Sequence, residues 1–129
     1  MRYMLLLYGC EGRPQPGEPG FEEARARVNG FVEECRRRGA FVGGDPLREE
    51  STATTVRGRD GQTLITDGPF AETHEQLGGY YILDCQGLDE ALELAALWPM
   101  VTTGAVEVRP LDYVPGLVWE TNGTPVAAE

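Results

Sequence analysis

Residues 2–8 constrain the fold more than any other segment, because they are apolar on both faces of a predicted strand. One face carries Tyr3, Leu5 and Leu7, and the other carries Met4, Leu6 and Tyr8. A strand of this kind must be covered on both sides. We therefore expect it to lie inside a sheet that packs against helices on one face and against a second body on the other.

The rest of the chain alternates strand-like and helix-like segments. In chain order these are strand 2–8, helix 21–38, strand 40–44, strands 51–57 and 62–66, strand 79–85, helix 88–98 and strand 105–110. The turn 59–61 contains Asp60-Gly61, a dipeptide typical of tight hairpins. This order predicts an α+β fold on the ferredoxin-like βαββαβ plan, with one inserted β-hairpin.

The ends of two predicted elements are each inferred from one proline. Asp45-Pro46 is expected to end strand 40–44, and Pro99 is expected to end the second helix. In this helix, from about Leu88 to Trp98, the residues expected on the inner face are Leu88, Ala91, Leu92, Ala95 and Trp98.

One sheet on two helices leaves the other face of the sheet bare. A second copy of the chain, related by a two-fold axis, is the simplest cover, so we predict a homodimer. Residues 1–111 are predicted to form one domain, and 112–129 an extended tail. The tail is apolar at Val114, Leu117, Val118 and Trp119, which we expect to lie along the body or along a partner subunit.

The charge of the chain excludes several classes of partner. Its 129 residues carry a net charge of −10, and all 11 basic residues other than the histidine are arginine. Nucleic acids and anionic membranes need a basic surface, so neither is expected as a partner. Without lysine, Schiff-base chemistry on a lysine amine is excluded. The short apolar start lacks a cleavage site, which favours a cytoplasmic protein over a secreted one.

Three cysteines are widely spaced and form no CxxC pattern. Cys35 and Cys85 fall at apolar positions and are predicted to be buried free thiols, whereas Cys10, beside Gly9, is predicted to be more exposed. Neither a disulfide nor a metal site follows from this spacing. We predict no cofactor and no metal.

The segment 66–81 holds the candidate functional residues, because it brings together acids, a Gly-Pro turn, aromatic residues and the sole histidine. Asp67 precedes Gly-Pro, so its carboxylate either caps the following turn or faces a ligand cleft. His74 lies seven residues further on. The two residues are our candidate acid/base pair, although a histidine flanked by acids is also typical of an exposed, unused side chain.

Five further residues are candidates for ligand binding: Arg57, Phe70, Glu72, Tyr80 and Tyr81. Phe70 is expected to plug the core or to form a wall of the cleft. Glu72 is expected to fix its loop by a hydrogen bond or by an ion pair to Arg57 or Arg109. The two tyrosines point to opposite faces of their strand, one under a helix and one toward the dimer cleft.

The segment 67–73 closely resembles the DGPF signature of the YCII-related protein family, and 1–6, 75–81 and 105–110 are similar to that family as well. The resemblance implies a ferredoxin-like dimeric α/β barrel, and members of this branch are often encoded beside extracytoplasmic-function sigma factors. The chain departs from the family at His74, where lysine is usual. It also has no histidine in helix 21–38, so a histidine–aspartate pair proposed for relatives has no counterpart here.

Three functions fit these observations. The first is a small enzyme or enzyme-like protein with a cleft between the sheet and the DGPF loop. It would bind a largely apolar molecule with one polar end, and Asp67, His74 and Tyr80 would transfer protons or orient the ligand. The second is a non-catalytic binding or accessory protein linked to a sigma factor. The third is a structural dimer module.

Overall fold

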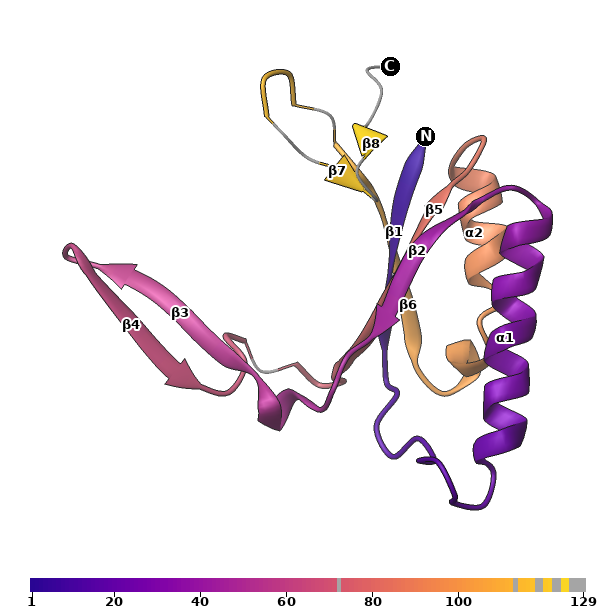
Figure 1. The fold of residues 1–129 in the computed structure, drawn as a ribbon, viewed down its shortest axis with the longest axis horizontal. Helices are drawn as coiled ribbons and strands as arrows, with labels where there is room; N and C mark the ends of the chain where they lie inside the picture. Colours follow the sequence, from indigo (N-terminus) through magenta and orange to yellow (C-terminus); the bar gives the residue numbers. More distant parts are fainter. Residues whose placement is uncertain (72, 113, 118–119, 122–123, 126–129) are drawn as a thin grey trace.

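The computed structural model describes residues 1–71, 73–112, 114–117, 120–121 and 124–125. Its main body is a four-stranded sheet with two helices on one face, and a hairpin projects from it (Figure 1). The elements are β1 (Arg2–Tyr8), α1 (Phe21–Arg37), β2 (Phe41–Pro46), η1 (Glu50–Thr52), β3 (Thr54–Arg59), β4 (Gln62–Asp67), β5 (Leu77–Asp84), α2 (Leu88–Ala95), η2 (Pro99–Thr102), β6 (Ala105–Pro110), β7 (Glu120–Thr121) and β8 (Thr124–Pro125).

The sheet has the strand order β2-β5-β1-β6, and all three neighbouring pairs are antiparallel. In the centre, Leu5 of β1 lies opposite Tyr81 of β5 and Val108 of β6. The predicted α+β class, the succession of strands and helices, and the inserted hairpin are confirmed. Strand β1 is central, as its two apolar faces require.

The core lies between the sheet and the helices. Tyr3, Leu5 and Leu7 of β1 are buried there, together with Phe31 and Cys35 of α1. On α2 the buried residues are Ala91, Leu94 and Ala95, whereas Leu88 and Leu92 are both 48% exposed. The expected inner face of this helix was therefore partly wrong. The helix ends at Ala95, so Trp98 belongs to the turn that follows it and reaches the core from there. Its burial therefore does not tell which side of α2 faces the sheet.

Four aromatic rings join the elements of this core. The Phe31 ring lies 5.1 Å from the Tyr81 ring and 5.4 Å from the Trp98 ring, between centroids. Tyr81 and Trp98 are 5.6 Å apart, and Phe41 of β2 lies 6.3 Å from Tyr81. These tilted and edge-on contacts are favourable for aromatic pairs. The rings connect α1, β2, β5 and the segment after α2.

Both edge strands of the sheet end in proline, Pro46 in β2 and Pro110 in β6. We expected Asp45-Pro46 to break β2, but the strand continues through Pro46, which lies opposite Gly79. Proline has no N–H to donate. At the end of an edge strand this does not disturb the pairing, because the N–H at such a position faces solvent and not the neighbouring strand.

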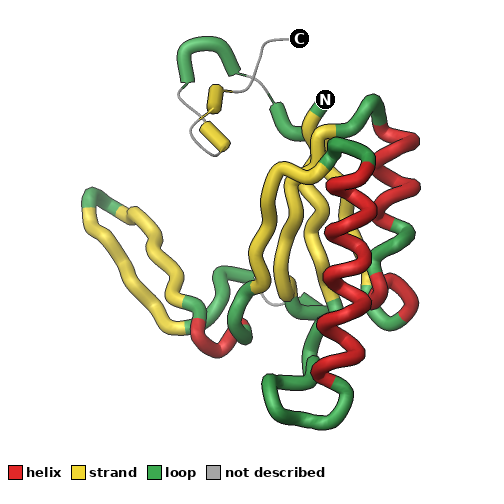
Figure 2. Tube along the Cα trace, turned by 45° about the vertical axis from the view of Figure 1, so that its right-hand side comes forward, coloured by secondary structure: helices red, strands yellow, loops and turns green. Residues whose placement is uncertain are grey.

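The hairpin β3–β4 projects on the side of the sheet opposite the helices (Figures 1 and 2). Asp60 and Gly61 at its tip both have positive φ, 52° and 74°, as the predicted tight turn requires. At its base, the Gly68 N–H donates to the Ala53 carbonyl over 2.7 Å, and Thr55 Oγ1 donates to the Gly68 carbonyl over 2.7 Å.

Two of the three cysteines are placed as predicted. Cys35 and Cys85 are buried free thiols, and burial raises the pKa of Cys35 to about 11. Cys10 is also buried, with 9% exposure, so its expected exposure was wrong. It packs against Gly78, where an added Cβ would lie 2.8 Å from the Cys10 Cβ. The missing side chain of Gly78 makes the room that Cys10 occupies.

The C-terminal segment differs from a plain extended tail. Its two-residue strands β7 and β8 pair with each other. Val114 and Leu117 are exposed, so the body of this chain does not cover them, and Val118 and Trp119 lie outside the described residues. Within the described part of the chain, no helix is both long and apolar enough to cross a membrane.

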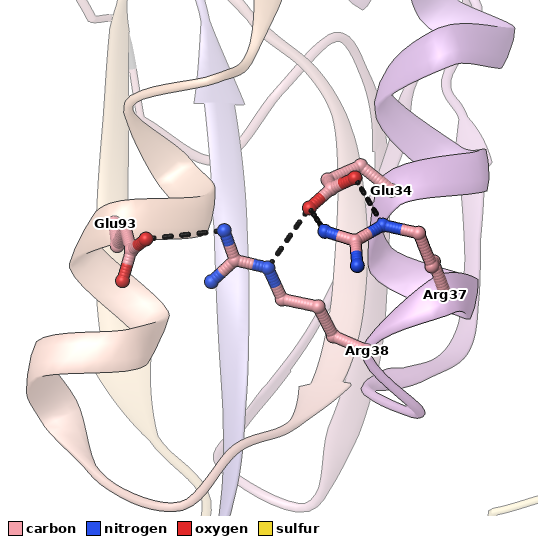
Figure 3. Close-up of polar contacts among 4 residues, drawn as sticks. All are labelled: Glu34, Arg37, Arg38 and Glu93. Atoms are coloured by element: carbon pink, nitrogen blue, oxygen red, sulfur yellow. Dashed lines mark hydrogen bonds and ion pairs between the residues drawn. The ribbon is translucent and has the colours of Figure 1, made fainter.

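An ionic network joins the end of α1 to α2 (Figure 3). Glu34 accepts hydrogen bonds from Arg37 Nε at 2.8 Å and from Arg38 Nε at 3.0 Å, and Arg37 Nη2 also pairs with it. Arg38 Nη2 donates to Glu93 Oε1 of α2 at 3.1 Å. The arginines hold the pKa of Glu34 at about 2. Arg38 thus bridges the two helices that cover the core.

Acid should remove the contribution of this network to stability. The pKa of the Glu34 carboxyl falls from 4.5 to about 2 on folding. Such a group stabilises the fold above its unfolded pKa, and the contribution is lost as pH falls through the folded pKa. We expect the Tm difference between wild type and Glu34→Gln, measured by circular dichroism, to be largest above about pH 5 and to shrink as pH falls toward about 2.

The matched control is Glu33→Gln. Glu33 lies next to Glu34 on α1 and is exposed, and it forms no ion pair among the described residues. Its replacement changes the net charge equally. Equal Tm changes for the two variants across the whole pH range would contradict a specific role of Glu34.

Candidate functional site

A cavity of about 240 Å³ lies between α1, strands β2 and β5, and the loop 9–20. Val28 of α1, Tyr81 of β5, Trp98 and Met100 contribute to its walls, and Arg13 of the loop also lines it. A concave, mainly apolar site with a few polar groups is the usual form of a small-molecule site. This cavity is therefore our candidate functional site.

Tyr81 reaches the cavity because the strand beside it carries glycine. Gly44 of β2 is the cross-strand partner of Tyr81. A Cβ at Gly44 would lie 2.5 Å from Tyr81 Cδ1 and 2.5 Å from the Tyr80 carbonyl oxygen. Real Cβ atoms do not approach so closely, so any larger residue would displace the ring or the strand. Gly44 thus fixes where the wall of the cavity lies.

Two residues of the cavity wall each carry a polar group that has no hydrogen-bond partner among the described residues. The Trp98 side chain is 5% exposed, and its indole N–H is buried without a hydrogen-bond acceptor among the described residues. The Tyr81 hydroxyl has no hydrogen-bond partner within the described part of the chain either, and burial raises its pKa. The Tyr81 hydroxyl is thus available to a ligand in the cavity, whereas the Trp98 indole N–H is closed off even from water.

Cys10 lines the same cavity but is not an activated nucleophile. Burial raises the pKa of its thiol, and the nearby guanidinium of Arg13 opposes this shift only in part. A thiolate is the reactive form of cysteine. At neutral pH the Cys10 side chain is therefore a protonated, weakly polar part of the wall.

The two tyrosines point to opposite faces of β5, as predicted. Tyr81 packs under the helices, whereas the Tyr80 hydroxyl donates to Asp45 Oδ2 at 3.0 Å. Tyr80 and Asp45 are cross-strand partners, so both side chains lie on the face away from the helices. The Asp45 carboxylate raises the pKa of Tyr80. Strands β2 and β5 border the cavity at these two residues, although their paired side chains lie on the other face of the sheet.

Asp67, Arg57 and Phe70 lie on or beside the hairpin, outside this cavity. The Arg57 guanidinium carbon is 4.6 Å from the centre of the Phe70 ring, which is 71% exposed. Cross-strand pairing puts Arg57 and Leu64 on one face of the hairpin, and Asp67 on the other. The structure therefore brings Arg57 to Phe70 and separates both from the Asp67 carboxylate.

The remaining candidates of the DGPF loop are exposed or not described. The Asp67 carboxylate has no hydrogen bond to any described residue, and the N–H of Gly68 is taken by Ala53. His74 is exposed and has no polar contact with the described residues. Glu72 lies outside the described residues. Within the described part, no three His, Cys, Asp or Glu side chains are grouped closely enough to hold a metal ion.

Sequence reasoning missed Arg13, Gly44 and Trp98 as site residues. Arg13 lies in a loop rich in proline and glycine, which gives no periodic signal, and Trp98 was assigned to the core alone. Gly44 would have been found only from its pairing with Tyr81, since a strand glycine opposite an aromatic residue often accommodates the ring.

Gly44→Ala should destabilise the protein. The added methyl group meets the backbone of β5 as well as Tyr81, and overpacking of this kind costs about 1–3 kcal/mol. The control is Gly58→Ala in β3, where an added Cβ meets nothing within 4 Å. Urea unfolding of both variants checks this expectation. A Gly44→Ala protein as stable as Gly58→Ala would contradict the close approach of Tyr81 to β2.

Comparison with known proteins gives three similarities. The YCII-related domain matches residues 1–113. An uncharacterized protein of Rhizobium meliloti (strain 1021) is 51% identical over 69 residues, which are 51% of this chain and 56% of that protein. The chain thus matches about half the length of this curated relative. A structure of 5-chloro-2-hydroxyhydroquinone dehydrochlorinase from Burkholderia phenoliruptrix AC1100, with 2,5-dihydroxybenzoquinone, has a TM-score of 0.48 and 14% identity, over 88% of this chain and 96% of that one.

Proposed function

The chain belongs to the family of YCII-related domains, and we propose that it binds a small, largely apolar molecule in the cavity under α1. The observation that carries this proposal is the cavity itself, whose wall is mainly apolar and includes Val28, Tyr81 and Trp98. A concave, mainly apolar site with a few polar groups is the usual form of a small-molecule site.

The size of the cavity limits the ligand. An apolar cavity of about 150 Å³ is enough for benzene. A cavity of about 240 Å³ therefore accommodates one substituted ring or an aliphatic body of similar size. Tyr81 also lines the cavity and offers its hydroxyl to such a ligand. Because burial raises its pKa, this hydroxyl stays protonated at neutral pH and can both donate and accept.

Binding is favoured over proton transfer as the primary role of this cavity. Its Cys10 and Tyr81 side chains are protonated at neutral pH, since burial raises both pKa values. Asp67 and His74 remain the predicted acid and base, but they are exposed and belong to the hairpin and its following loop. The non-catalytic binding protein foreseen from the sequence is thus the better supported function.

The test is a thermal-shift panel of single-ring compounds, including phenol, benzaldehyde, benzyl alcohol and benzoate. A ligand at 100 times its Kd adds about 2.7 kcal/mol, which raises Tm by several degrees. Tyr81→Phe keeps the aromatic ring without the hydroxyl, and we expect about 2- to 10-fold weaker binding of the best compound. Tyr8→Phe is the control, because Tyr8 is not among the residues that line the cavity. Unchanged binding by Tyr81→Phe, or no shift with any compound, would refute the proposal.

We further infer that a second copy of the chain covers the bare face of the sheet and forms the dimeric α/β barrel. This face carries five partly exposed apolar or aromatic side chains: Met4, Leu6, Tyr8, Tyr80 and Ile82. Charged residues lie at its margin, with Arg109 opposite Met4 and Glu107 opposite Leu6. An apolar centre with a charged rim is typical of a protein interface.

Leu6→Arg should convert the dimer to a monomer. Arginine puts a charge in the middle of the bare face. Within one chain it lies opposite Glu107, which has the opposite charge, so no like charges are brought together there. Light scattering after size exclusion should give twice the chain mass for wild type and the single mass for the variant. Leu92→Arg, on the exposed side of α2, is the control and should stay dimeric. A wild-type monomer at micromolar concentration would refute the dimer.

A further inference from the structure

Arg13 is held at the edge of the candidate cavity by backbone carbonyls. Its Nη2 donates to the Leu47 carbonyl at 2.6 Å, and its Nη1 donates to the Gly78 carbonyl at 3.4 Å. These contacts fix the guanidinium between the ends of β2 and β5. An arginine has five N–H donors, so three remain for another partner.

The guanidinium of Arg13 forms no ion pair with an acidic side chain of the described residues. Arg25, which lines the same cavity, is paired with Glu22. The Asp45 carboxylate is bonded to Tyr80 on the opposite face of the sheet. Arg13 is thus the unpaired cation of the described cavity lining.

The field of this cation reaches into the cavity. Arg13 lowers the pKa of the buried Cys10 thiol, against the larger effect of burial. Cys10 lines the cavity together with Tyr81 and Trp98. An anionic group bound to Arg13 would therefore sit close to the apolar walls. Arginine binds a carboxylate through two parallel N–H groups, and such charge-assisted bonds are strong where water is excluded.

The surroundings limit the ligand to one anionic group. Arg13 also lines a larger hollow of about 880 Å³, whose wall carries Glu11, Glu18, Glu49 and Glu50. A second carboxylate on the ligand would meet these acids on that side or the apolar wall on the other. Both positions are unfavourable for a negative charge.

We propose that the ligand is a small monocarboxylate, with its carboxylate on Arg13 and a body of about one ring in the cavity beside Tyr81 and Trp98. This inference rests on the proposed binding function and adds the chemical class of the ligand. Arg13 is the residue that selects an acid over a neutral molecule of the same shape.

The test compares benzoate, uncharged benzyl alcohol and doubly charged terephthalate by calorimetric titration of the full chain. Wild type should bind benzoate more tightly than the other two. In Arg13→Gln, benzoate affinity should fall by about 10- to 150-fold, the range of a charged hydrogen bond, while benzyl alcohol affinity changes little. Arg13→Lys keeps the positive charge but lacks the two parallel N–H groups of the guanidinium, so its affinity for benzoate should be intermediate. Arg48→Gln, an exposed arginine on the larger hollow, is the control.

The outcomes separate this proposal from the one on which it rests. A merely structural Arg13 would weaken both benzoate and benzyl alcohol in the Gln variant, because a loosened loop affects every ligand. That result, or equal binding of benzoate and benzyl alcohol by wild type, overturns the monocarboxylate proposal and leaves the cavity proposal standing. If neither compound binds and no compound of the thermal-shift panel binds, both proposals fall.

Discussion

The contact of the Tyr81, Phe31 and Trp98 rings is the interaction on which the rest of the structure depends. Each ring comes from a different element, and the three centroids lie within 5.6 Å of one another. Aromatic side chains bury large areas, so this cluster supplies much of the packing between the sheet and its helices. The cavity lies beside the cluster, with Tyr81 and Trp98 in its lining. The stability of the fold and the proposed ligand binding thus depend on the same side chains.

The fold was largely predictable because its signals are local. Alternating apolar residues defined β1, and Asp60-Gly61 defined the hairpin turn. Errors arose where a tertiary contact decides. Cys10 looked exposed next to Gly9, but it is buried because Gly78, far along the chain, leaves room for it. Leu92 was expected on the inner face of a helix that runs to Trp98, but α2 ends at Ala95 and Leu92 is exposed.

The site was harder to predict than the fold. The DGPF loop attracted attention because it concentrates reactive residue types, yet Asp67 lies at the end of an exposed hairpin strand. Tyr81, at the end of the same motif, does reach a cavity. The difference comes from the register of β5 with β2, which decides the face on which each side chain lies. Arg13 becomes visible only when a loop without periodic pattern is placed against two strand ends.

The prolines that end β2 and β6 have a consequence for aggregation. An open sheet presents unpaired backbone groups at each edge, which can recruit further strands and grow into a polymer. Here one edge strand ends at Pro46 after a bulge near Phe41, and the other ends at Pro110 beside the charged Arg109. Prolines, bulges and charges all oppose strand addition. Growth by edge pairing is thus discouraged, whereas the proposed association through the sheet face does not use these edges.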